Sequence, residues 1–218
     1  MSLPDFFNDF EIWHRMLKAL PYDRLPGLDA QLKMAPEIRH ADVRSLGQDR
    51  GATLSSVLFL FYPAGDGTPT TVFIQRPTYK GAHSGQISFP GGRYEEGDAS
   101  LQYTALRETY EEIGVHPDQV EVAGRLTDLF IPPSNYIVSP FLGVTTQRPE
   151  FVPDPGEVVK VLEIPVKAFF QEAYCMHKTI HLSDGFSVQT PCFSINGHII
   201  WGATAMMISE FVEMVKQV

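Results

Sequence analysis

The sequence of 218 residues has few features of a secreted or membrane-bound protein. It contains only two cysteines, Cys175 and Cys192, and their spacing is not that of a metal site. We expect buried free thiols rather than a disulfide, consistent with a reducing cytoplasm. No apolar run approaches the ~20 residues that cross a bilayer, and the N-terminus lacks the basic and apolar segments of a secretion signal. These absences predict a cytoplasmic location and no membrane partner.

Positive charge is also scarce. Lys and Arg number 17 against 26 Asp and Glu, which gives a net charge of -9. This balance argues against a broad basic surface for nucleic acid, so no nucleic-acid partner is expected. The negative net charge is still compatible with a small polyanion that is bound through a metal ion and a few cationic side chains. Hydrophobic residues at 44% are enough for the core of one compact domain.

Three glutamates form the most informative cluster. Glu108, Glu111 and Glu112 lie in a stretch expected to be helical, within an arc of about 100° on one face. The opposite, core-facing side of this helix is expected to carry Leu106, Tyr110 and Ile113. Clustered carboxylates weaken a helix, which is easiest to explain if a divalent cation neutralises them. Ligands that are all oxygen favour Mg²⁺ or Mn²⁺.

A glycine-rich loop precedes this helix. Residues 89–98 contain a proline and adjacent glycines that permit close backbone approach to a ligand. Asp98 is expected to cap the helix N-terminus, and Gly114 to end the helix. Loop carbonyls can therefore face the same ion as the helix carboxylates.

The pattern of Gly92 followed by Arg107-Glu108-x-x-Glu111-Glu112-x-Gly114 resembles the Nudix box. Two features depart from the general pattern: Asp98 replaces a glutamate, and the interval from Asp98 to Arg107 is one residue longer. The resemblance implies an α/β (α+β) fold, a Nudix-type α/β/α sandwich with a mixed sheet. It also implies that Glu111 and Glu112 are metal ligands, that Glu108 is a ligand or the general base, and that the Gly92 carbonyl is a further ligand.

The longer interval resembles the coenzyme A pyrophosphatase branch of that family. Residues 76–92 resemble its second signature, with departures at Pro77 and Gly81, and residues 200–205 resemble its C-terminal end. This likeness implies Mg-dependent hydrolysis of coenzyme A or an acyl-coenzyme A to 3′,5′-ADP and a phosphopantetheine product. ADP-ribose or a dinucleoside polyphosphate stays open as substrate. A non-catalytic nucleotide-binding module is the alternative from another class.

Further candidates surround this box. Arg107 is expected to pair with a carboxylate and fix its rotamer. Arg76 follows a strand and is a candidate for phosphate binding, although an exposed arginine at a strand end is equally ordinary. Lys80 and His83 lie in the same segment and are weaker substrate candidates. Glu157 follows a Pro-Gly loop and is the second candidate for the general base.

The chain is expected to divide into a helical arm, 1–50, packed on a hydrolase domain, 51–218. Residues 4–20 read as an amphipathic helix, and 21–50 as irregular. The arm and the apolar last helix leave room for a homodimer. Strands are expected at 55–62, 70–75, 86–89, 120–127, 139–146, 158–164, 179–182, 186–190 and 192–195, and helices at 165–174 and 201–216.

Overall fold

The computed structural model describes residues 5–36, 51–78, 84–181, 185 and 187–218. Two of the predicted substrate residues, Lys80 and His83, lie outside them. The helices are η1 (Asp5–Phe7), α1 (Phe10–Lys18), α2 (Gly27–Leu32), α4 (Leu101–Ile113), η3 (Pro117–Gln119), η4 (Val166–Phe170), η5 (Glu172–Tyr174) and α5 (Gly202–Val215). The strands are β1 (Thr53–Pro63), β2 (Pro69–Gln75), β3 (Ile87–Ser88), β4 (Gly91–Arg93), β5 (Glu121–Arg125), β6 (Leu129–Ile131), β7 (Tyr136–Val144), β8 (Lys160–Pro165), β9 (Cys175–His181), β10 (Ser187–Ile195) and β11 (His198–Trp201).

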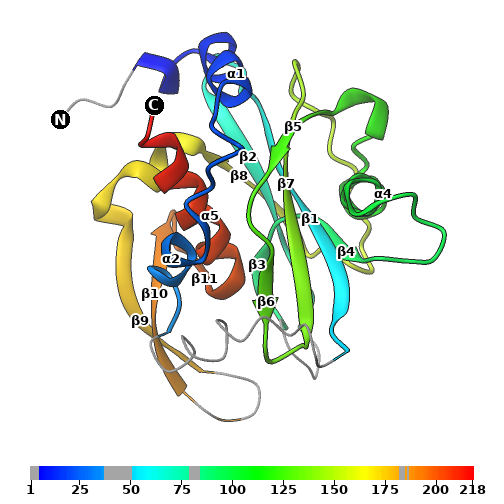
Figure 1. The fold of residues 1–218 in the computed structure, drawn as a ribbon, viewed down its shortest axis with the longest axis vertical. Helices are drawn as coiled ribbons and strands as arrows, with labels where there is room; N and C mark the ends of the chain where they lie inside the picture. Colours follow the sequence, from blue (N-terminus) through cyan, green and yellow to red (C-terminus); the bar gives the residue numbers. More distant parts are fainter. Residues whose placement is uncertain (1–4, 37–50, 79–83, 182–184, 186) are drawn as a thin grey trace.

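A mixed sheet forms the middle layer. Its main path runs β3-β2-β1-β7-β5, with β4 on β1, β6 on β7 and β8 on β2. The β1–β7 pair is parallel, and the other pairs of this sheet are antiparallel. Helix α4 lies on one face, and α1, α2 and α5 lie on the other (Figure 1). The predicted α/β/α sandwich with a mixed sheet is confirmed.

Strand β1 supplies side chains to both faces because successive residues of a strand point in opposite directions. Leu58, Leu60 and Tyr62 belong to the core beneath α4. Phe59 and Phe61 belong to the larger core beneath α5. Strand β4, which is part of the glycine loop, pairs with β1. The site described below is therefore built beside a strand that is buried on both faces.

The described part of the N-terminal arm contributes to the larger core. Trp13 and Leu17 of α1 are fully buried, and the Trp13 ring lies 5.7 Å from Phe61 and 5.9 Å from Phe211. The helix predicted at 4–20 is two pieces, η1 and α1. Within the stretch predicted as irregular, the structure has the short helix α2.

A buried carboxylate joins this arm to the last helix. Glu210 of α5 is fully buried and accepts hydrogen bonds from the Gly27 N–H (3.1 Å), the Gln31 amide (2.7 Å) and the Thr127 hydroxyl (2.6 Å). Several neutral donors thus satisfy a charge that burial alone would make costly. The contact ties α2 and α5 to Thr127, which lies between β5 and β6.

A second sheet, in the order β11-β10-β9, extends from the main body (Figure 1). Predicted strands at 186–190 and 192–195 are one strand, β10, and residues 165–174 are two 3-10 helices rather than one α-helix. Strand β6 was not predicted. Cys192 is buried as expected, but the Cys175 side chain is exposed at the start of an edge strand, and both thiols are free.

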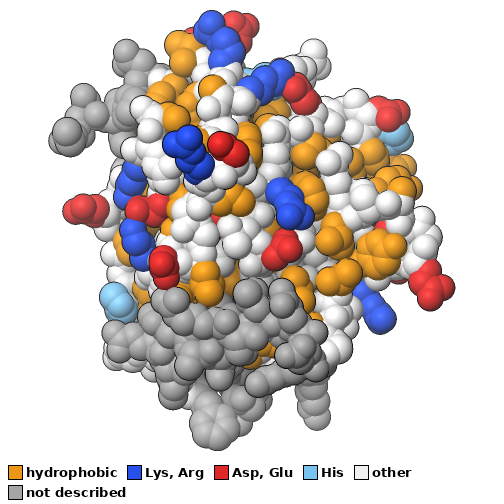
Figure 2. Space-filling view, in the orientation of Figure 1, with side chains coloured by type: hydrophobic (Ala, Val, Ile, Leu, Met, Phe, Trp, Pro, Cys, Tyr) orange, Lys and Arg blue, Asp and Glu red, His pale blue; other side chains and the backbone are white. Residues whose placement is uncertain are grey.

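The surface in Figure 2 carries Lys and Arg side chains dispersed among acidic and apolar ones. Among the described residues, no helix is both long and apolar enough to cross a bilayer.

Candidate metal and phosphate site

Helix α4 begins and ends on local signals. The Ser100 hydroxyl accepts from the Tyr103 N–H at 3.1 Å and caps the N-terminus. Gly114 ends the helix in the left-handed region, with φ of 76°. The prediction that Asp98 is the N-cap was therefore wrong, because Asp98 is engaged elsewhere. Tyr110 was expected in the core, but half of it is exposed, against the ring of His116.

Asp98 is a buried anchor for Arg107. The Arg107 Nε donates to Asp98 Oδ1 at 2.8 Å, and Nη2 donates to Oδ2 at 2.9 Å. Asp98 also accepts from the Glu95 N–H at 3.1 Å and the Thr104 hydroxyl at 2.8 Å. Hydrogen bonding from Arg107 is the largest cause that holds the pKa of Asp98 well below its usual range.

Arg107 carries this anchor to the glutamates. Its Nη1 donates to Glu108 Oε1 and to Glu111 Oε2, both at 2.9 Å, and Nη2 donates to the Arg93 carbonyl at 3.1 Å. Hydrogen bonding to Asp98 is the main cause that raises the pKa of Arg107, so the guanidinium stays charged. One arginine thus fixes two of the three candidate carboxylates.

Glu112 lies on the buried side of α4, with only 1% of its surface exposed. The expectation that all three glutamates face away from the core is therefore wrong for this residue. Its Oε2 accepts from the Gly91 N–H at 2.8 Å, and its Oε1 lies 3.4 Å from Arg76 Nη1. The pKa of Glu112 is raised to about 8, mainly by burial and also by the charges of Glu108 and Glu157, while the Gly91 N–H and Arg76 oppose the rise.

Gly92 provides the space for Glu108. A Cβ at this position would lie 2.3 Å from Glu108 Oε2, so a side chain would displace the carboxylate. The Gly92 carbonyl accepts from the Ser55 hydroxyl at 2.7 Å. Burial also raises the pKa of Glu108, with Arg107 opposing it.

The late loop brings Glu157 toward the same carboxylates. Glu157 is exposed, and its charge raises the pKa values of both Glu108 and Glu112. The loop is attached to α4, since the Asp154 N–H donates to the Glu112 carbonyl at 3.0 Å. Residues about 45 positions apart in sequence therefore share one electrostatic site.

The donor set fits a hard divalent cation by its chemistry. The carboxyl groups of Glu108 and Glu157 both act electrostatically on that of Glu112, and each of the three offers only oxygen. Within the described part of the chain, no three acidic, histidine or cysteine side chains are yet gathered closely enough to hold a metal ion. Arg107 holds Glu108 and Glu111, and Arg76 contacts Glu112. Side-chain rotation away from these arginines would be needed for a common ligand set.

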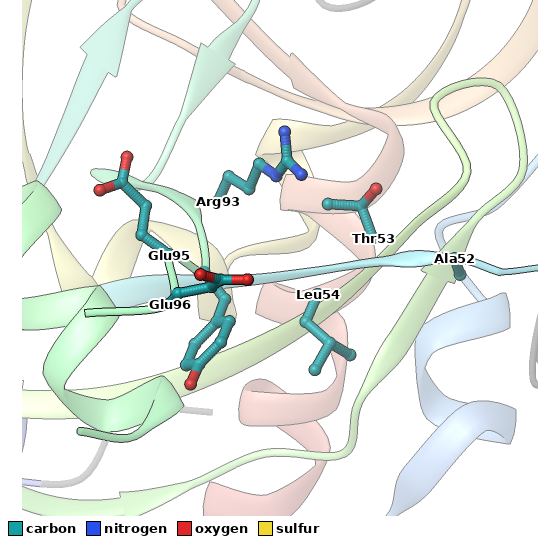
Figure 3. A pocket seen from close by; sticks show the side chains of 7 residues that line it. Ala52, Thr53, Leu54, Arg93, Glu95 and Glu96 are labelled. Atoms are coloured by element: carbon teal, nitrogen blue, oxygen red, sulfur yellow. The ribbon is translucent and has the colours of Figure 1, made fainter. Parts of the chain in front are cut away.

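A surface hollow of about 580 Å³ lies beside this site, between the start of β1 and the loop after Gly92 (Figure 3). Arg93 and Thr53 extend to one side of β1, and Leu54 extends to the other. The hollow is lined by Ala52, Thr53, Leu54, Arg93, Tyr94, Glu95 and Glu96. The three glutamates of α4 do not line it, so it is an adjoining space rather than the carboxylate site.

The Nudix domain family profile matches residues 54–180, which span the sheet, the glycine loop and α4. This chain belongs to the Nudix family. It is 31% identical over 152 residues to the uncharacterized Nudix hydrolase NudL of Photorhabdus laumondii, covering 68% of this chain and 78% of that one. The NudL of Pectobacterium atrosepticum is 30% identical over 183 residues, covering 83% and 88%.

Solved structures agree at the level of the fold. The Nudix hydrolase RenU of M. smegmatis aligns with a TM-score of 0.50 at 12% identity, covering 77% of this chain and 88% of that one. An Ap4A hydrolase of C. elegans aligns with a TM-score of 0.51 at 13% identity, covering 76% and 99%. The chain is thus a Nudix pyrophosphohydrolase, a member of a family that acts on nucleotide diphosphate compounds and generally uses divalent metal ions.

Some site residues were not found by sequence reasoning. Asp98 was interpreted as a helix cap, and the structure makes it the anchor of Arg107. Ser55 on β1 contacts the Gly92 carbonyl, and Asp154 connects the late loop to α4. The sequence did carry a signal for the role of Asp98, because this residue departs from the general Nudix box. The other two depend on contacts between distant segments, which one sequence does not reveal.

Proposed function

We propose that this Nudix hydrolase cleaves the diphosphate bond of coenzyme A or an acyl-coenzyme A with Mg²⁺ or Mn²⁺. The observation that supports this site best is the meeting of Glu108, Glu112 and Glu157 in one electrostatic environment beside Arg76. Such an arrangement suits pyrophosphate hydrolysis, because the negative charge of the substrate needs cations nearby and the attacking water needs a proton acceptor.

The chemistry is the attack of water on a phosphorus atom. Glu108 or Glu157 accepts a proton from the water, whose oxygen bonds to phosphorus while the bridging P–O bond breaks. In this proposal Arg76, which contacts Glu112, would donate to non-bridging phosphate oxygens after it leaves that carboxylate. A bound divalent cation supplies charge neutralisation and lowers the pKa of a coordinated water. The products from coenzyme A would be 3′,5′-ADP and phosphopantetheine.

The roles of the chain's own residues follow from their contacts. Asp98 and Arg107 hold Glu108 and Glu111 in place, and the Gly91 N–H holds Glu112. We assign Glu108, Glu111, Glu112 and the Gly92 carbonyl as ligands, and Glu108 or Glu157 as the base. Lys80 and His83 remain substrate candidates by sequence alone.

Support for coenzyme A comes from the sequence signatures at residues 76–92 and 200–205, with the departures at Pro77 and Gly81. ADP-ribose and dinucleoside polyphosphates are the rival substrates. A substrate panel that includes coenzyme A, acetyl-coenzyme A, ADP-ribose and diadenosine tetraphosphate decides between them. Products are identified by mass spectrometry, and substrates are ranked by kcat/KM. A higher kcat/KM for ADP-ribose than for either coenzyme A compound would overturn the substrate assignment.

The site assignment has its own test. Replacing Glu111 and Glu112 together by Gln keeps their shape and removes their charge. We expect a rate loss of at least ~10²-fold at limiting Mg²⁺. The exposed Glu150→Gln is the matched control and should keep wild-type turnover. Near-wild-type turnover of the double variant would refute the site. Binding of nucleotide without Mg²⁺-dependent cleavage would favour the non-catalytic module.

Cytoplasmic location, the homodimer and the division into arm and domain are further parts of this proposal. Light scattering on the purified chain tests the dimer, and a mass of twice 24.4 kDa is the expected result for a dimer.

A further inference from the structure

The loop that carries Glu157 is fixed at both ends. At one end, the Val152 N–H donates to the Ile113 carbonyl at 2.9 Å, and the Asp154 N–H donates to the Glu112 carbonyl at 3.0 Å. At the other end, the Val159 N–H donates to the Gln75 carbonyl at 2.9 Å. One attachment point includes the site residue Glu112, and the other, Gln75, directly precedes Arg76. The segment therefore spans from the last turn of α4 to the end of β2.

Packing supports these bonds. Val158 is buried, with 4% of its surface exposed, and joins the core beneath α4. A Cβ on Gly114 would lie 2.9 Å from the Val152 Cβ, so the loop passes closely over the end of the helix. Glu157, in contrast, is exposed between these two attached regions. Its backbone is held, and its side chain is free to meet a reacting group.

Asp154 is the centre of the turn that presents Glu157. Its Oδ1 accepts from the Gly156 N–H at 2.7 Å. Its carbonyl accepts from the Glu157 N–H at 3.1 Å and from the Val158 N–H at 2.8 Å. Together with the bond to Glu112, one residue links the backbone of a candidate metal ligand to the backbone of a candidate base.

We propose that Asp154 is a positioning residue, which sets the distance of the Glu157 carboxylate from the carboxylates of α4. This inference rests on the proposed function, in which Glu157 accepts a proton or assists the metal site. In this role the Asp154 side chain only accepts a hydrogen bond from the Gly156 N–H. The turn therefore requires its oxygen atom but not its negative charge. Displacement of a reacting group by about 1 Å can cost as much as ~10²-fold in rate, so a small shift of this turn is enough to matter.

The substitution test separates these two properties. Asp154→Ala removes the acceptor, and we expect kcat to fall roughly ten- to a hundredfold with little change in KM. Asp154→Asn keeps an oxygen acceptor in the same place and should restore activity close to wild type. The assay uses Mg²⁺ with coenzyme A, or with ADP-ribose if that is the better substrate. A loss in Asp154→Asn equal to that in Asp154→Ala would overturn the proposal, because charge would then be required.

Asp66 provides a matched control. It lies in the turn between β1 and β2, where its Oδ1 accepts from the Thr68 N–H at 2.9 Å, the same type of local bond. Asp66→Ala should leave kcat unchanged. An equal loss in Asp66→Ala would show a general effect of loosened turns and would also overturn the proposal.

A double-mutant cycle tests whether Asp154 acts through Glu157. In the Glu157→Gln background, Asp154→Ala should cause no further loss of kcat, since the group that it positions is already disabled. Full additivity of the two losses would contradict the inference. If the wild type is active, Glu108→Gln is inactive and Glu157→Gln is fully active, the proposed function stands and this inference fails.

Amide hydrogen exchange supplies a readout that needs neither metal nor substrate. Asp154→Ala should accelerate exchange at Gly156, Glu157 and Val158, while amides of β1 keep their protection. Unchanged exchange at these three amides would show that the turn does not depend on the Asp154 side chain, and would refute the positioning role.

Discussion

Arg107 and Asp98 form a two-point ion pair, with contacts of 2.8 and 2.9 Å, at the base of the candidate site. The Asp98 side chain is 2% exposed and that of Arg107 is 17% exposed. The pair turns the remaining Arg107 donor toward Glu108 and Glu111. We therefore expect both stability and activity to depend on this contact between a loop and a helix.

Replacing Asp98 by Asn should destabilise the protein by about 3 kcal/mol, because Arg107, most of which is shielded from water, loses its main charge partner. Urea unfolding measures this change. Glu96, an exposed carboxylate in the same loop, supplies the control Glu96→Gln, which should stay within about 0.5 kcal/mol of wild type.

The same variant should alter the response to acid. The pKa of Asp98 in the folded protein is held below its unfolded value of about 3.9 by Arg107. Its stabilisation is thus present above about pH 4 and is lost as the pH falls through the folded pKa. Wild type should lose stability below pH 4 more steeply than Asp98→Asn. Equal slopes would contradict the assignment.

Gly92→Ala should lower activity while the fold persists. The added Cβ would contact the Glu108 carboxylate, the flexible end of a side chain, so the carboxylate can rotate away at small cost in stability. We expect a fall in kcat of at least ~10-fold and a nearly unchanged melting temperature. Gly97→Ala, in the same loop with open space around its Cβ, is the control and should leave both quantities unchanged.

Glu112 should make the metal-free protein less stable as the pH rises. Burial raises its folded pKa to about 8, above the unfolded value of about 4.3, so the folded state holds its proton more tightly. Stability in EDTA should therefore decline between about pH 4.5 and 8, and Glu112→Gln should show a weaker decline. Added Mg²⁺ should raise the melting temperature more at pH 8 than at pH 5, since a ligand must be deprotonated. A pH-independent Mg²⁺ effect would count against Glu112 as ligand.

Trp13→Ala tests the tie between arm and domain. Trp13 is fully buried against Phe61 and Phe211, so its truncation should cost about 3–5 kcal/mol. Denaturant unfolding should show one transition with a lower midpoint. The neighbouring exposed Ile12→Ala is the control and should cost far less. A small loss in Trp13→Ala would indicate an arm that contributes little to the core.

The sequence was informative where structure follows local patterns. Helical spacing located α4, and Gly114 marked its end, because glycine alone adopts φ of 76° without strain. Ser100 and Asp98 are both acceptable caps, and local rules cannot choose between them. The choice was decided by Arg107, which binds Asp98 from the second turn of the helix.

Other predictions from the sequence were wrong or missing for the same reason, because contacts between distant segments decide the structure there. Helical periodicity placed all three glutamates on the face away from the core, but the glycine loop folds over α4 and covers Glu112, whose carboxylate accepts a hydrogen bond from the Gly91 N–H. The contact of Asp154 with α4 joins segments over 40 positions apart, and the short strand β6 forms only because β7 lies beside it. Such elements depend on tertiary contacts rather than on local propensity.

The hydrogen bond from Gly27 to Glu210 joins positions 183 apart in the chain. Synthesis proceeds from the N-terminus, so Gln31 and Trp13 emerge long before the helix that covers them. The larger core can close only after α5 has been made. Contacts of such long range slow folding and prolong the exposure of apolar surface. A ribosome stalled within α5 would therefore hold a nascent chain in which Trp13 lacks its contact with Phe211.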